Sequence, residues 1–153
     1  MKKDLFALLH SIRSLHNVGS MFRTADGAGV EKLFLCGETG VPPRAEIAKT
    51  ALGAEESVPW EYWMDTKECL AKLKKEGVRI VALELTPRSI DYRRVVAKGH
   101  VCLVVGSEVG GIPDSILELC DEAIRIPMRG AKESLNVSVA FGVAVYEMVR
   151  SES

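Results

Sequence analysis

The 153-residue chain lacks the marks of several common protein classes. No hydrophobic run approaches the roughly 20 residues that a membrane-spanning helix needs. The apolar stretch at residues 5–9 is too short for a signal peptide, so we expect a cytoplasmic protein. The formal net charge is −1, whereas a protein that binds nucleic acid by charge alone is usually strongly basic. Any binding of nucleic acid must therefore use local basic patches or a shaped pocket.

The cysteines do not form a metal-binding pattern. They are Cys36, Cys69, Cys102 and Cys120. No two of them are spaced as CxxC, and no histidine pair has zinc-ligand spacing. Two cysteines lie in apolar, strand-like runs. We therefore expect free, mostly buried thiols in a reducing compartment, and no bound metal.

Two common nucleotide-binding motifs are also absent. The dinucleotide fingerprint GxGxxG fails because Lys32 stands where the third glycine should follow Gly27 and Gly29. The P-loop GxxxxGK[ST] fails because Ile112 stands in the lysine position after Gly106 and Gly111. The sequence therefore argues against a nicotinamide site of the Rossmann type and against a P-loop.

Short apolar segments alternate with helical patterns along the whole chain. We predict strands at residues 5–9, 33–36, 79–85, 101–105 and 123–126. We predict helices at residues 17–28, 44–52, 65–76, 113–119 and 134–150. This alternation predicts one α/β domain over residues 1–153, with a mostly parallel sheet flanked by helices. Ligands of such sheets bind beyond the carboxyl ends of the strands.

The last predicted helix, residues 134–150, has almost no polar face. Its apolar residues include Val139, Phe141, Val145 and Tyr146. A helix that is apolar all round is buried all round, and one sheet can cover only one side of it. We therefore expect a homodimer with this helix in the interface.

The first segment that carries chemistry is residues 16–26. We expect Asn17 to cap the helix, and Gly19 to let another part of the chain approach its first turn. Arg23 follows Asn17 by almost two turns, so the two side chains would not share a helix face. Taken alone, these residues are better explained by a cap and a surface arginine than by a site.

The other two segments follow predicted strands. In residues 101–113 a buried strand runs into a glycine-rich turn, and Glu108 in that turn has little reason to be there for packing. This pattern fits a tight turn and a ligand loop equally. In residues 124–138 the residues Ser134, Asn136 and Ser138 cluster at a helix start, where one capping residue would suffice. A helix N-terminus suits a polar or anionic ligand group.

Together the three segments resemble the three sequence motifs of the SpoU/TrmH branch of the SPOUT methyltransferases. Residues 17–26 resemble motif 1, residues 106–112 resemble motif 2, and residues 126–140 resemble motif 3. The motifs stand in the family's order and spacing, and the resemblance runs from about residue 8 to residue 148. It implies a parallel α/β fold with a C-terminal trefoil knot, a rare exception to unknotted topology, and a dimer.

The resemblance also implies a cofactor and a reaction. S-adenosylmethionine would lie in the knot, held by backbone groups near Leu83, Gly106, Ile126 and Leu135, with Ser134 beside them. Its methyl group would pass to a ribose 2′-hydroxyl in RNA, a displacement that needs alignment of the reactants and the handling of one proton. No metal is required.

The family's central catalytic residue corresponds to Arg23, which the family proposal makes a base. An arginine keeps its proton at ordinary pH, so stabilising the developing alkoxide or gripping a phosphate is physically easier. Asn17 would orient Arg23 or the nucleotide. Glu108, Ser134 and Asn136 would complete the pocket.

The candidate phosphate contacts are Lys2, Lys3, Arg13, Arg44, Lys49, Arg129 and Lys132, of which the last two lie within motif 3. The size of the chain favours tRNA over rRNA as substrate. One alternative is a catalytically silent module on the same fold that binds RNA or the ribosome; it would be expected to have lost some pocket residues. Another is a flavodoxin-type domain, which would need a flavin or phosphate loop that we do not find.

Overall fold

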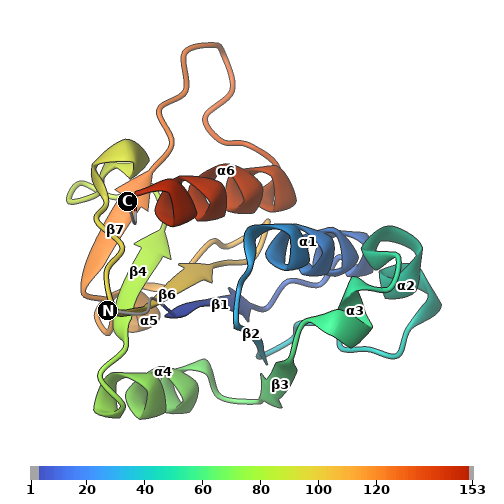
Figure 1. The fold of residues 1–153 in the computed structure, drawn as a ribbon. Helices are drawn as coiled ribbons and strands as arrows, with labels where there is room; N and C mark the ends of the chain where they lie inside the picture. Colours follow the sequence, from blue (N-terminus) through green and yellow to red (C-terminus); the bar gives the residue numbers. More distant parts are fainter. Residues whose placement is uncertain (1–3, 152–153) are drawn as a thin grey trace.

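The structure is a computed structural model that describes residues 4–151 (Figure 1). Its strands are β1 (Asp4–His10), β2 (Lys32–Cys36), β3 (Trp60–Trp63), β4 (Arg79–Leu83), β5 (Ile90–Asp91), β6 (His100–Val105) and β7 (Glu122–Arg125). Its helices are α1 (Leu15–Ala28), α2 (Ala45–Ala51), α3 (Ala54–Ser57), α4 (Thr66–Lys75), the 3₁₀ turn η1 (Tyr92–Arg94), α5 (Asp114–Leu117) and α6 (Val137–Arg150).

The strands form one seven-stranded sheet in the order β3-β2-β1-β6-β4-β7-β5, and every ladder between them is parallel. β1 lies in the interior of the sheet, where Leu8 is opposite Phe34 of β2 and Val104 of β6. The central strands are buried over most of their length because helices cover both faces. The predicted α/β fold with a parallel sheet is confirmed.

Two hydrophobic clusters lie on opposite faces of the sheet. Ala7 and Leu9 of β1 pack with α1, α2, α3 and α6, whereas Leu8 packs with α4 and α5. Figure 1 shows α1 and α6 side by side on the first face and α4 on the other. Successive residues of a strand point to opposite faces, so an apolar run such as that of β1 fills both clusters. No helix in residues 4–151 has the length and apolarity that crossing a bilayer would require.

The start of α1 differs from the prediction. Ser14 caps the helix, because its Oγ accepts a hydrogen bond from the backbone N–H of Asn17 at 3.2 Å. The prediction that Asn17 is the cap is therefore wrong, and Asn17 lies within the first turn. Gly19 does allow a close approach: a Cβ there would overlap the Thr50 hydroxyl and the carbonyl oxygen of Ile47, at the contact with α2.

The start of α6 lies three residues later than predicted. Asn136 caps it through Oδ1, which accepts from the backbone N–H of Ser138 at 2.9 Å and from the Ser138 hydroxyl at 2.6 Å. Ser134 is therefore in the preceding loop. Within α6, Phe141 and Val145 are buried, while Val139 and Tyr146 are each 51% exposed. Residues 4–151 thus cover one side of the helix and leave the other exposed.

Other differences concern short elements. The predicted strand 79–85 ends at Leu83, and β3, β5, α3 and η1 were not predicted. β5 has only two residues, and the aromatic edge strand β3 contains a charged residue, so neither shows a strong apolar pattern. The four cysteines are free, as expected, and only Cys120 is partly exposed.

Candidate functional site

A cavity of about 1170 Å³ lies at the carboxyl ends of β4, β6 and β7. Its wall includes the last residue of each of these strands, Leu83, Val105 and Arg125. All five residues predicted around the methyl donor line it: Leu83, Gly106, Ile126, Ser134 and Leu135. Glu108 and Asn136 also line it. The structure thus brings residues from two of the three sequence segments into one cavity.

The turn after β6 forms one wall of this cavity. The backbone N–H of Gly111 donates to the carbonyl oxygen of Ser107 at 2.9 Å, which closes the turn. A Cβ on Gly106 would lie 2.5 Å from the carbonyl carbon and oxygen of Gly111, so no side chain fits there. Gly111 has a φ of 63°, a conformation that favours glycine. The glycines therefore bring bare backbone to the cavity.

Glu84 is a wall residue that the sequence analysis did not single out. It follows β4 directly, and its Oε1 accepts a hydrogen bond from the backbone N–H of Ile112 at 3.1 Å. Burial raises the pKa of Glu84, and the bond from Ile112 partly opposes that rise. The available signal was a carboxylate at the carboxyl end of an apolar parallel strand, where ligands of such sheets bind.

The loop 126–136 between β7 and α6 forms another wall of the cavity and projects from the body of the protein in Figure 1. Ser134, Lys132 and Glu133 are exposed on this loop and line the cavity. The hydrogen bonds of Asn136 Oδ1 account for Asn136 and Ser138 as a helix cap. Ser134 remains the polar residue of this segment that capping does not explain.

Asn17 reaches the edge of this site, whereas Arg23 does not. The Asn17 side-chain amide donates to Glu108 Oε1 at 3.4 Å, which joins the first turn of α1 to the glycine turn. Arg23 is exposed farther along α1 and is not part of the cavity wall. Among residues 4–151 its guanidinium has no hydrogen-bond or ion-pair partner. As expected for two helical residues at this spacing, the two side chains do not act on one face.

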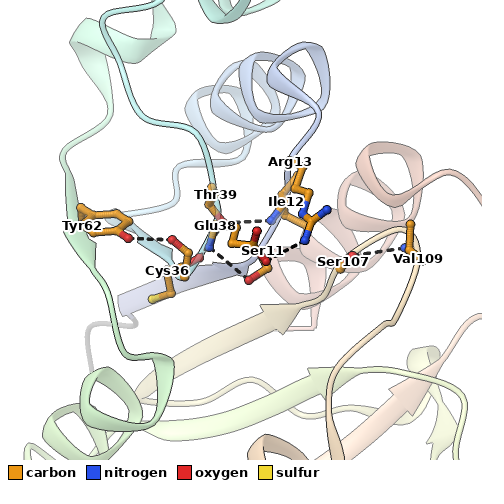
Figure 2. Close-up of polar contacts among 10 residues, drawn as sticks. Ser11, Ile12, Arg13, Cys36, Glu38, Thr39, Tyr62, Ser107 and Val109 are labelled. Atoms are coloured by element: carbon orange, nitrogen blue, oxygen red, sulfur yellow. Dashed lines mark hydrogen bonds and ion pairs between the residues drawn. The ribbon is translucent and has the colours of Figure 1, made fainter.

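Arg13 lies near the same edge of the sheet, in the loop after β1. Figure 2 shows its ion pair with Glu38, at 2.8 Å, beside the turn that carries Ser107 and Val109. The hydrogen bond and charge of Glu38, and more weakly the charge of Glu108, raise the pKa of Arg13. Thr39 anchors this loop: its buried hydroxyl accepts from the backbone N–H of Ile12 at 2.9 Å. Arg13 is therefore held at the rim of the site by an acidic partner.

The candidate phosphate contacts differ in how they are paired, and Lys2 and Lys3 lie outside the described residues. Arg13 is paired with Glu38, and Arg44 lies 3.8 Å from Glu46. Arg129 and Lys132 are exposed on the loop 126–136 and have no acidic partner in the part of the chain that the structure describes. Within that part, no three His, Cys, Asp or Glu side chains are grouped so that they could hold a metal ion.

Comparison with known proteins gives consistent matches. The sequence model of the SpoU rRNA Methylase family matches residues 4–146. The 23S rRNA (guanosine-2′-O-)-methyltransferase RlmB of Ralstonia nicotianae is 36% identical over 149 residues, which are 97% of this chain and 59% of that protein. The curated relatives are longer proteins, and the chain spans 59% to 61% of their length.

Two solved structures show the same fold over nearly the whole chain. The AdoMet-bound rRNA methyltransferase of Sinorhizobium meliloti has a TM-score of 0.92 and 29% identity, covering 99% of this chain and 58% of that one. A structure that concerns the 2-OH methylation of C/U34 on tRNA has a TM-score of 0.87 and 26% identity, covering 97% of this chain and 96% of that one. The family match over residues 4–146 and the 36% identity to RlmB show that this chain belongs to the SpoU family of RNA methylases.

Proposed function

We propose that the chain methylates a ribose 2′-hydroxyl in RNA with S-adenosylmethionine as the methyl donor. The observation that carries this proposal is the cavity at the carboxyl ends of β4, β6 and β7, whose wall contains all five residues expected around the donor. The bound AdoMet in the S. meliloti relative, which has the same fold, supports the choice of cofactor.

The cavity has the chemistry that this donor requires. Leu83, Ile126 and Leu135 offer apolar surface for a purine. Lys132 and Ser134 offer polar groups for the amino-acid end. Gly106 leaves its backbone accessible because a side chain there would collide with Gly111. A cavity lined by both apolar and polar residues fits a ligand in which a nucleoside is joined to an amino acid.

When bound, the donor supplies a methyl group already activated on a sulfonium. The protein has to align the ribose oxygen, stabilise the charge that develops on it and let its proton leave. Arg23 is the residue we assign to stabilising this charge or gripping the adjacent phosphate, since its guanidinium stays protonated. Asn17 positions Glu108 at the cavity edge through the bond between their side chains.

We infer that the active form is a homodimer. Val139 and Tyr146 lie two turns apart on α6 and form an exposed apolar face of that helix. α1, which carries Arg23, packs beside α6. Arg23 is not part of the cavity wall of its own protomer. A dimer formed through this face would cover the face and would bring Arg23 of one protomer toward the cavity of its partner.

The order of the strands supports the expected trefoil knot. The segment 84–99 leaves β4, forms β5 at the far edge of the sheet and returns to β6. β7 lies between β4 and β5, inside the loop that this segment makes. The chain reaches β7 from α5 on one face of the sheet and continues to α6 on the other. A chain end that passed through the loop in this way would tie the trefoil knot that we propose.

The test is transfer of a labelled methyl group from S-adenosylmethionine to RNA. Unmodified tRNA and 23S rRNA transcripts should both be offered, since the relatives include enzymes of rRNA and of tRNA. We expect one of them to accept about one methyl per site and to become resistant to alkali at that nucleotide. The preference for tRNA stays a prediction that this comparison decides.

The competing function is an RNA-binding module without catalysis. It predicts binding of RNA without saturable binding of S-adenosylmethionine in calorimetry. The presence of Asn17, Arg23, Glu108, Ser134 and Asn136 favours the enzyme, because a silent module has no need to keep this set. Donor binding without transfer to either RNA would contradict the proposed substrates.

A further inference from the structure

The carboxylate of Glu84 has no part in the reaction proposed above, although it forms part of the cavity wall. Its position is fixed by the backbone. The N–H of Glu84 donates to the carbonyl oxygen of Ile124 at 3.0 Å, which extends the contact of β4 with β7. The side chain therefore starts from a rigid point between two central strands of the site.

Within residues 4–151, one oxygen of this carboxylate has a hydrogen-bond donor. Oε1 accepts from the N–H of Ile112 at 3.1 Å. Oε2 has no donor among residues 4–151, although both oxygens lie against the glycine turn, 2.9 Å from the position of a Cβ on Gly111. Glu84 is partly buried, and this burial raises the pKa of its carboxyl group. A polar group in such surroundings is stabilised by a hydrogen-bond donor that a ligand brings.

The neighbours of Glu84 indicate which part of the donor comes near it. Leu83, Leu85 and Ile126 give this part of the wall an apolar surface suited to a purine. The charged and polar groups Lys132 and Ser134 are on the loop 126–136 instead. Glu84 thus belongs to the nucleoside end of the cavity. The donors there are the two ribose hydroxyls and the 6-amino group of adenine, and the deoxy analogues used below distinguish the hydroxyls from the amino group.

We propose that Glu84 is a specificity residue that accepts a hydrogen bond from a ribose hydroxyl of the adenosyl donor through Oε2. The inference rests on the proposed donor site. A carboxylate at a strand end that holds a ribose hydroxyl is also the solution used by dinucleotide-binding sheets. A site built for such a hydroxyl discriminates against a ligand that lacks it, because the carboxylate then loses its partner.

The test measures binding of S-adenosylhomocysteine and of its 2′-deoxy and 3′-deoxy analogues by calorimetry. The wild-type protein should bind at least one deoxy analogue about tenfold more weakly than the parent, the loss expected for a hydrogen bond to a charged group. Glu84→Ala should bind the parent and that analogue equally. Comparing the two ligands within each protein cancels any general weakening of the variant's fold.

The matched control is Glu133→Ala, which removes an exposed carboxylate from the same cavity wall. It should keep the wild-type discrimination. 5′-Methylthioadenosine keeps the ribose and lacks the amino-acid end, so Glu84→Ala should weaken it by the same factor as S-adenosylhomocysteine. Weakening of S-adenosylhomocysteine alone would place Glu84 on the ammonium and overturn the inference.

Two further outcomes would also overturn it. In the first, the deoxy analogue binds more weakly than S-adenosylhomocysteine by the same factor in the wild type and in Glu84→Ala. The other is full wild-type affinity for both deoxy analogues. If the wild-type protein binds no S-adenosylhomocysteine, the donor site itself fails and the role of Glu84 fails with it, so the two failures are distinguishable.

Discussion

The side chains of Asn17 and Glu108 meet at 3.4 Å although 91 positions separate them in the sequence. One belongs to the first turn of α1 and the other to the glycine turn after β6. The contact links the helix that carries Arg23 to the wall of the cavity at the ends of β4, β6 and β7. Two sequence motifs that the chain keeps far apart are thereby joined at one hydrogen bond.

This pair should behave as a unit in catalysis. Asn17→Ala and Glu108→Ala should each lower kcat/KM for methyl transfer, and the double variant should lose little more than the worse single one. The reason is that each substitution removes the same contact, so the effects do not add. Steady-state kinetics of the four proteins checks this, and fully additive losses would show that the two residues act separately.

Arg23→Ala should abolish methyl transfer and leave donor binding unchanged. Arg23 is not part of the cavity wall, so its loss removes no contact with the donor. Single-turnover transfer and calorimetry with S-adenosylmethionine measure the two effects. Lys75→Ala, an exposed cation at the end of α4 on the other face of the sheet, is the control and should keep full activity. Near wild-type turnover of Arg23→Ala would remove Arg23 from the mechanism.

Val139→Glu should convert a dimer into monomers. The substitution places a charge on the exposed apolar face of α6, where association would bury it. Sedimentation velocity should show half the wild-type mass, with donor binding kept and methyl transfer lost, because Arg23 would no longer reach a partner's cavity. Met64→Glu changes an 82% exposed apolar residue outside α6 and should remain dimeric. A monomeric wild-type protein with full activity would contradict the assignment.

Gly106→Ala should destabilise the fold by about 1–3 kcal/mol, the usual cost of an extra methyl group in a packed site. The new Cβ would lie 2.5 Å from the backbone of Gly111, which cannot move aside as a flexible side chain does. Urea unfolding measures the free energy, and calorimetry should show weaker donor binding. Gly110→Ala has nothing within 4 Å of its Cβ and should be neutral. Equal stability of the two variants would mean that the backbone of Gly111 can shift to accommodate the extra methyl group.

Cys120 should be the first cysteine to be alkylated in the native protein, and it should react slowly. The other three thiols are buried, while Cys120 is partly exposed and burial raises its pKa to about 11. At pH 8 a thiol of this pKa is ionised roughly a hundredfold less than a free cysteine, and the thiolate is the reactive form.

The measurement is the rate of iodoacetamide labelling, located by mass spectrometry. Raising the pH should speed the labelling of Cys120, as long as the fold persists. Cys120→Ser should remove the first modification, and unfolding in urea should expose all four cysteines. Rapid labelling of Cys36 or Cys69 in the native protein would contradict their burial.

The parallel sheet was predictable because its central strands are apolar runs that only a sheet covered on both faces can accommodate. β3 and β5 were not, because pairing with β2 and β7 places them in the sheet and their own residues show no strand pattern. The cap of α1 was misplaced because Ser14 and Asn17 are both good capping residues, and the sequence does not show which hydroxyl or amide reaches the free N–H groups.

The cavity residues were predictable from the family motifs, which place Gly106 and Leu135 beside the donor. Glu84 was not, because it carries no motif and was counted as part of a strand that ends one residue earlier. The position of Arg23 outside its own cavity follows from how α1 packs on the sheet, which a local pattern does not contain. Contacts between distant segments, such as that of Asn17 with Glu108, were likewise beyond the sequence.

The place of β1 in the sheet sets the order in which this protein becomes complete during translation. The ribosome releases the N-terminus first, but β1 has to wait for β6, whose residues follow about two-thirds of the chain later, before its second edge is paired. The cavity waits longer still, for the loop 126–136 and the start of α6. A nascent chain therefore carries an open edge in the middle of its future sheet until β6 has emerged, and no cofactor can stabilise this domain until α6 has begun to emerge.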